Sequence, residues 1–148
     1  MTLSAAQVAK RICERSGWKL SNLEIQKLVY LIHMRYLGRM QKPLIRESFE
    51  AWDYGPVEPG LYHRLKAFGS DPVVGVFNSV PDVADEEAAN FIDDTYDMLS
   101  GFSAPQLVSI THAPHSAWYK NYRRNVRNSL IPREAILEEF KARESARR

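Results

Sequence analysis

The sequence is poor in cysteine, with Cys13 as the single example among 148 residues. One cysteine can form neither an internal disulfide nor a cysteine-rich zinc site, which fits a reducing compartment. Long hydrophobic runs are also missing, because the longest aliphatic and aromatic run, residues 28–32, is far too short to cross a bilayer. Basic residues interrupt the first segment, so it does not resemble a signal peptide. We therefore expect a cytoplasmic protein that has no membrane partner.

Sequence motifs for catalysis are missing as well. The chain contains no GxSxG, GxxxxGK[ST], GxGxxG or HExxH pattern. His112 and His115 have the spacing of two ligands on one helical face, but Pro114 lies between them and interrupts the helix. The sequence therefore predicts no enzyme, no catalytic residue, no metal and no cofactor. A metal-dependent hydrolase that uses these two histidines is the weakest alternative.

Positive charge is missing from the middle of the chain. Residues 67–119 contain 8 acidic residues and no Lys or Arg, whereas residues 1–66 contain 11 basic and 6 acidic residues and residues 120–148 contain 9 basic and 4 acidic residues. Such blocks can pair inside a fold or present opposite potentials to a partner, and internal pairing is the simpler interpretation. Asp93 and Asp97 fall opposite the apolar stripe of their helix, which predicts a solvated acidic face.

Helix start signals recur along the chain. Ser4, Ser21 and Ser103 are each followed three residues later by Gln or Glu, the spacing of a capping box. Further helices are expected to begin near Pro59, Asp85 and Pro132, and to end at Gly17, Gly38, Gly69 and Gly101. The helix between Ser21 and Gly38 is apolar on most sides, which predicts a buried central helix.

Residues 44–54 have an imperfect alternation that predicts a strand near residues 49–52, ended by a sharp corner at Gly55-Pro56. A second short strand is expected within residues 70–84, paired with the first. Together these features predict a mainly α, compact single-domain bundle of about six helices with a small two-stranded hairpin. The domain is expected to span residues 1–148, with a core at about 5–140 and a charged, fraying tail at 141–148.

Several short segments in a fixed order carry the most specific signal. They are residues 22–30 (NLEIQKLVY), 49–59 (FEAWDYGPVEP), 61–63 (LYH), 109–112 (SITH), 117–118 (AW) and 131–132 (IP). This series resembles the Panacea domain family, which includes GepA-like phage-associated proteins and SocA-type antitoxins, over about residues 5–140. The family usually has an acidic residue shortly before the late tryptophan, whereas residues 111–118 (THAPHSAW) contain none.

The resemblance implies an antitoxin that neutralises a cognate toxin by direct protein binding. For SocA-type members it also implies a proteolytic adaptor, which delivers the toxin to the ClpXP protease. Composition and periodicity show neither activity. They are compatible with both, because a small helical domain with an aromatic corner offers anchors of the kind that dominate protein interfaces.

Six residues are candidates for partner binding: Trp52, Tyr54, Tyr62, Trp118, Arg123 and Arg124. For the three aromatic residues near the corner, packing inside the core is the simpler interpretation, and a partly exposed hot spot is the alternative. The stretch 118–127 interleaves aromatic with basic residues, so a nucleic-acid-binding regulator is the alternative function. A basic cluster alone is a weak indication of nucleic acid, and a protein partner is therefore preferred.

Overall fold

The computed structural model describes residues 2–126 and 128–147, so Arg127 of the basic stretch and Arg148 of the predicted tail lie outside the described residues. The helices are α1 (Ala5–Ser16), α2 (Asn22–Met40), α3 (Pro59–Leu65), the 3-10 helix η1 (Lys66–Phe68), α4 (Glu86–Leu99), α5 (Ala104–Thr111), α6 (Ala117–Asn121) and α7 (Arg133–Ala146). The strands are β1 (Phe49–Trp52), β2 (Gly55–Val57) and β3 (Leu130–Ile131). The prediction of a mainly α fold with a small antiparallel hairpin is confirmed.

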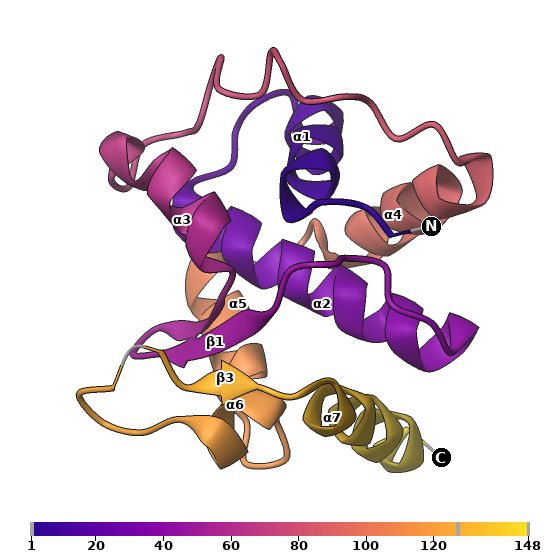
Figure 1. The fold of residues 1–148 in the computed structure, drawn as a ribbon, viewed down its shortest axis with the longest axis vertical. Helices are drawn as coiled ribbons and strands as arrows, with labels where there is room; N and C mark the ends of the chain where they lie inside the picture. Colours follow the sequence, from indigo (N-terminus) through magenta and orange to yellow (C-terminus); the bar gives the residue numbers. More distant parts are fainter. Residues whose placement is uncertain (1, 127, 148) are drawn as a thin grey trace.

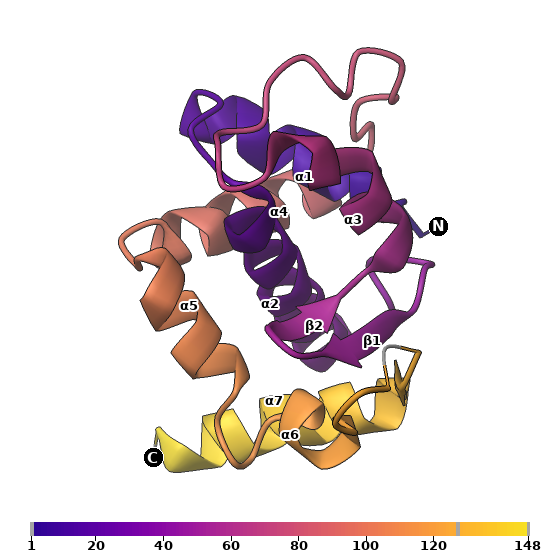
Figure 2. The ribbon, with the colours of Figure 1, turned by 90° about the vertical axis from the view of Figure 1, so that its left-hand side faces the viewer.

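Helix α2 lies at the centre of the fold, as its apolar sequence predicted. It contacts α1, α3, α4, α5, α7 and β2, and most of its residues are buried. Figure 1 shows α2 crossing the middle of the molecule, with α1 above it and α7 below. The view in Figure 2 shows α6 and α7 together across the bottom, and α1 and α4 near the top. Neither α2 nor any other helix in the described part of the chain is long and apolar enough to span a membrane.

The predicted helix starts are confirmed. The side chains of Ser4, Ser21 and Ser103 each accept a hydrogen bond from the backbone N–H three residues on, and the side-chain oxygen of the Gln or Glu there accepts one from the serine N–H. The predicted end of α2 is wrong, because the helix continues through Gly38 to Met40. Gly38 has a packing role instead: a Cβ at this position would overlap the ring of Phe140 on α7. The glycine lets the two helices approach closely.

The sheet has the strand order β2-β1-β3 and is antiparallel throughout. Gly55-Pro56 was predicted as the corner after the first strand, but these residues form β2, and Asp53 and Tyr54 make the turn. The partner strand predicted within residues 70–84 is also wrong, since this segment is irregular in the structure. Its prolines interrupt any ladder, and it instead inserts apolar side chains such as Val73 and Phe77 into the core.

The opposite charge blocks pair inside the fold, as the simpler interpretation predicted. Arg11 donates two hydrogen bonds to Asp93, at 2.9 and 2.8 Å, and Arg15 donates two to Asp97, at 2.8 and 2.7 Å. These pairs connect α1 to α4. The predicted solvated face is therefore wrong for Asp93, whose side chain is only 15% exposed, and is correct for Asp97 at 52%.

The C-terminal segment is helical well past the start of the predicted tail. Helix α7 continues through Lys141 to Ala146. The reason is a pair of contacts made by Arg143, which donates hydrogen bonds to the buried carboxylate of Glu139 and to the carbonyl of Ile110 on α5. These contacts fix the last turns of α7 against the body of the protein.

Candidate partner-binding site

The hairpin of β1 and β2 lies on polar residues of α2. Gln26 uses both atoms of its amide: Oε1 accepts from the N–H of Glu58 at 3.0 Å, and Nε2 donates to the carbonyl of Glu58 at 3.5 Å. The carboxylate of Glu58 then accepts from the N–H groups of Gly60 and Leu61, which begin α3. One glutamine side chain thus fixes the point at which the chain leaves the hairpin and enters the next helix.

Lys27 supports the hairpin from below. It is 0% exposed, and its Nζ donates to the carbonyl of Pro56 at 3.2 Å. Burial lowers the pKa of Lys27 to about 7, because the interior disfavours the charged ammonium. Gly55 has a φ of 115°, and a Cβ there would lie 2.8 Å from Cε of Lys27. Both its backbone conformation and this close approach require glycine at position 55.

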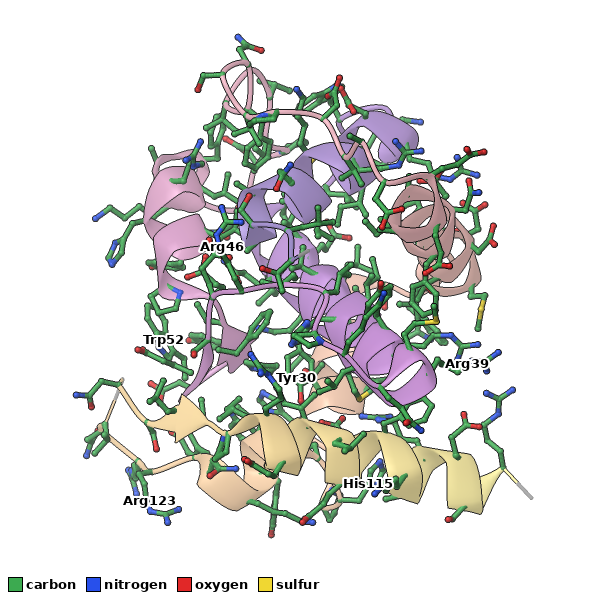
Figure 3. All side chains as sticks on the ribbon, turned by 45° about the vertical axis from the view of Figure 1, so that its right-hand side comes forward. Tyr30, Arg39, Arg46, Trp52, His115 and Arg123 are labelled. Carbon is green, nitrogen blue, oxygen red and sulfur yellow. The ribbon has the colours of Figure 1, made fainter. Side chains whose placement is uncertain are left out.

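A second polar network joins three helices around Glu139, which is 0% exposed. Its Oε1 accepts from the hydroxyl of Tyr30 at 2.6 Å and from the N–H of Ala117 at 3.0 Å, and its Oε2 pairs with Arg143. Figure 3 shows Tyr30 between α2 and α7. A buried carboxylate requires such partners, and here they connect α2, α6 and α7.

Three rings are stacked beneath the hairpin turn. Trp118 lies between His112, at 3.8 Å between ring centroids, and Tyr122, at 4.7 Å. The indole N–H of Trp118 donates to the carbonyl of Trp52 at 2.5 Å, and the hydroxyl of Tyr122 donates to Asp53 at 2.5 Å. Burial lowers the pKa of His112, which favours a neutral ring in the stack. Two hydrogen bonds thus hold the turn, one at the backbone carbonyl of Trp52 and one at the side chain of Asp53.

A pocket of about 240 Å³ opens beside this turn. Its lining residues come from α2, the hairpin and the α3–η1 region: Asn22, Leu23, Gln26, Lys27, Trp52, Tyr54, Val57, Tyr62, Lys66 and Gly69. We call it the aromatic pocket. The rings of Trp52 and Tyr62 meet edge to face at 4.8 Å, and Tyr54 is 72% exposed. Oδ1 of Asn22 is buried and has no hydrogen-bond partner within the described residues.

The structure brings only some of the candidate residues together. One pocket is lined by Trp52, Tyr54 and Tyr62. Trp52 is buried, which fits the core interpretation, whereas Tyr54 is exposed, which fits the hot-spot alternative, and Tyr62 is half-buried. Trp118 lies in the ring stack and is 8% exposed, so it supports the turn from beneath and offers little surface to a partner.

Arg123 and Arg124 lie in the loop after α6, where both are exposed, and Figure 3 shows Arg123 projecting from this loop. Sequence reasoning missed Asn22 and Lys66 of the pocket wall, for which no sequence pattern gives a signal. It also missed Lys27. Here the sequence did contain a signal, because a lysine within a helix that is apolar on most sides must be buried or paired.

Comparisons with known proteins identify the family of the chain. The family model described as "Antitoxin SocA-like, Panacea domain" matches residues 25–119, a range that contains the hairpin, its supports on α2, and His112 and Trp118 of the ring stack. Antitoxin SocA of Caulobacter vibrioides (strain NA1000 / CB15N) is 33% identical over 109 residues, which is 67% of this chain and 58% of that protein. No solved structure matches the chain. On the strength of the family match, the chain belongs to the SocA-like antitoxin family with a Panacea domain.

Proposed function

We propose that this protein is an antitoxin that neutralises a cognate toxin by binding it directly. The family match supports an antitoxin role, and that role implies a toxin as partner. The chain spans 58% of the length of the relative it matches, so the activity of the whole relative is carried over here as a proposal.

The exposed Tyr54 at the rim of the aromatic pocket is the observation that supports this contact surface best. Tyrosine and tryptophan dominate the energetics of protein interfaces, where they supply large contact areas at a low cost in conformational entropy. The turn that carries Tyr54 is held by Lys27 below β2 and by Trp118 at Trp52. A turn fixed in this way loses little freedom when a partner binds, so more of the contact energy is retained as affinity.

The pocket also has the chemistry to accept one side chain of the toxin. Its aromatic walls suit an apolar or planar group. We therefore expect a toxin residue with such a side chain, for example tryptophan or arginine, at the centre of the interface.

A binding measurement with matched variants tests this surface. The toxin encoded by the adjacent gene is purified and titrated against the wild type, Tyr54→Ala and Tyr119→Ala. Tyr119 is a suitable control because it is also an exposed tyrosine, at 57%, but lies on α6 outside the pocket. We expect Tyr54→Ala to weaken binding at least about tenfold, as for a hot-spot residue, and Tyr119→Ala to bind normally. Unchanged affinity in Tyr54→Ala would refute this surface.

Delivery of the toxin to the ClpXP protease is a finer proposal, which rests on the likeness to SocA-type antitoxins. In this mechanism the protein acts in the cytoplasm and binds toxin and protease together. The toxin is then expected to be degraded faster in the presence of this protein and ClpXP than with either alone. A toxin half-life that this protein does not shorten in the presence of ClpXP would contradict delivery and support neutralisation without degradation.

The nucleic-acid alternative has weaker support than a protein partner. The Trp118 ring is stacked with His112 and with Tyr122 and is only 8% exposed, so it offers little surface on which a base could stack. Lys120 lies 3.9 Å from Glu138, which reduces the positive charge of the stretch. Arg123 and Arg124 remain exposed. Binding of RNA or DNA that falls steeply with salt and is lost in Arg123→Ala/Arg124→Ala would favour this alternative.

A further inference from the structure

A second hollow lies toward the other end of α2 and shares no lining residue with the aromatic pocket. It has a volume of about 390 Å³ and lies between α2, α4, α5 and α7. Its apolar lining includes Leu31, Met34, Met98, Leu99, Phe102 and Phe140. We call it the apolar groove. Its volume falls in the range of about 300–1,000 Å³ that is usual for binding sites.

Two large apolar side chains at the groove are unusually exposed. Met98 near the end of α4 is 55% exposed, and Phe102 in the following turn is 40% exposed. Single exposed apolar residues are common, but neighbouring ones that line a hollow indicate a surface that another molecule covers. Methionine is also well suited to this task, because its flexible thioether adapts to different partners.

Positive charge is concentrated at the end of the same groove. Arg35 lines it, and burial together with the positive charges of Arg39 and Arg147 lowers the pKa of Arg35, while Glu144, which also lines the groove, acts in the opposite direction. Arg147 is paired with Glu144 at 3.5 Å, whereas Arg35 and Arg39 have no ion pair with any described residue. Figure 3 shows Arg39 on the side of the molecule opposite Trp52. The crowded guanidinium groups favour a partner that brings negative charge.

We propose that the apolar groove binds an acidic amphipathic helix of a partner protein. The apolar face of this helix covers Met98 and Phe102, and its acidic residues pair with Arg35 and Arg39. A helix is favoured because the groove runs between helices, and an amphipathic helix laid in an apolar groove is a recurrent mode of recognition. This surface is separate from the aromatic pocket, so the inference does not depend on where the toxin binds.

The proposal is tested with two synthetic helical peptides and the full chain. Both peptides carry leucines at helical spacing on one face; the flanking positions are glutamate in one and lysine in the other. Fluorescence anisotropy at low and moderate salt measures their binding. We expect the glutamate peptide to bind saturably, at least tenfold more tightly than the lysine peptide, and to weaken as salt rises.

Variants locate the binding and provide the control. Met98→Asp is expected to reduce binding of the glutamate peptide at least tenfold, because it places a like charge in the groove, and its exposed position leaves the fold intact. Arg35→Ala/Arg39→Ala is expected to abolish the preference between the peptides, while Tyr54→Ala binds normally.

Three outcomes would overturn the proposal. The first is no saturable binding, the second is equal affinity for both peptides in the wild type, and the third is binding that Tyr54→Ala removes and Met98→Asp does not. Light scattering decides the occupant: a dimer of the wild type that Met98→Asp dissociates would identify a second copy of this chain in place of a partner helix.

Discussion

Replacement of the buried Lys27 by Met is expected to stabilise the protein near neutral pH and to flatten its pH dependence. Burial lowers the pKa of Lys27 to about 7 from its ordinary value of 10.5. Between these values the unfolded chain holds the proton and the folded chain does not, so the free energy of unfolding rises with pH. The ammonium therefore costs stability in full below pH 7, and the cost disappears above the pKa of the unfolded chain.

The size of the effect follows from this difference. Each pH unit between the two pKa values corresponds to about 1.4 kcal/mol, so the cost of Lys27 is about 4–5 kcal/mol at pH 7 and about 2 kcal/mol at pH 9. Methionine has a similar length but leaves the carbonyl of Pro56 without its donor, at a loss of about 1 kcal/mol. We expect Lys27→Met to be more stable by about 3–4 kcal/mol at pH 7 and by about 1 kcal/mol at pH 9.

Urea denaturation followed by far-UV circular dichroism, at half-unit steps from pH 7 to 9, measures this difference. Other groups titrate in the same way in both proteins and cancel, including the thiol of Cys13, whose pKa is raised to about 12 by burial. Lys66→Met, at an exposed lysine of the aromatic pocket, is the control and should follow the wild type at every pH. A wild-type curve parallel to that of Lys27→Met would refute the argument that Lys27 is neutralised on folding.

Three further substitutions test the packing. Gly38→Ala is expected to destabilise the protein by about 2 kcal/mol, because its methyl group collides with Phe140, and an unchanged urea midpoint would contradict the close helix contact. Glu139→Leu leaves a buried hydroxyl, an N–H and a guanidinium without their acceptor, and a loss of about 3 kcal/mol in the same assay is expected. Arg11→Ala, which removes the pair with Asp93 at the edge of the α1–α4 contact, should cost at most about 1 kcal/mol. Half of that loss is expected to disappear in 1 M salt, and a larger effect that is independent of salt would show that the pair acts as a buried one.

Local signals in the sequence predicted most of the helices. Ser4, Ser21 and Ser103 are followed by a side chain that returns a hydrogen bond within one turn, and such signals need no knowledge of the rest of the fold. The central position of α2 was predictable for the same reason, because its apolar residues occupy most of the helix surface. Errors arose where distant residues decide the outcome. Gly38 does not end α2, and the close contact that its missing Cβ allows is with Phe140, about a hundred residues later in the chain.

The candidate site was predictable only in part. The aromatic residues at the corner were identified, and the structure brings Trp52, Tyr54 and Tyr62 to one pocket. Their different exposures follow from the turn at residues 53–54, which points Tyr54 outward while the strand directs Trp52 inward. Asn22 could not be identified, because a buried unpaired amide is a property of the assembled pocket and leaves no pattern in the sequence.

A growth assay tests the central claim most directly. The adjacent gene product is expressed from an inducible promoter, alone and together with this protein as wild type, Tyr54→Ala or Tyr119→Ala. The account predicts that the gene product alone stops growth, that the wild type and Tyr119→Ala restore it, and that Tyr54→Ala restores it poorly although it is present at the same level. A gene product that is harmless by itself, or growth arrest that the wild type does not relieve, would contradict it.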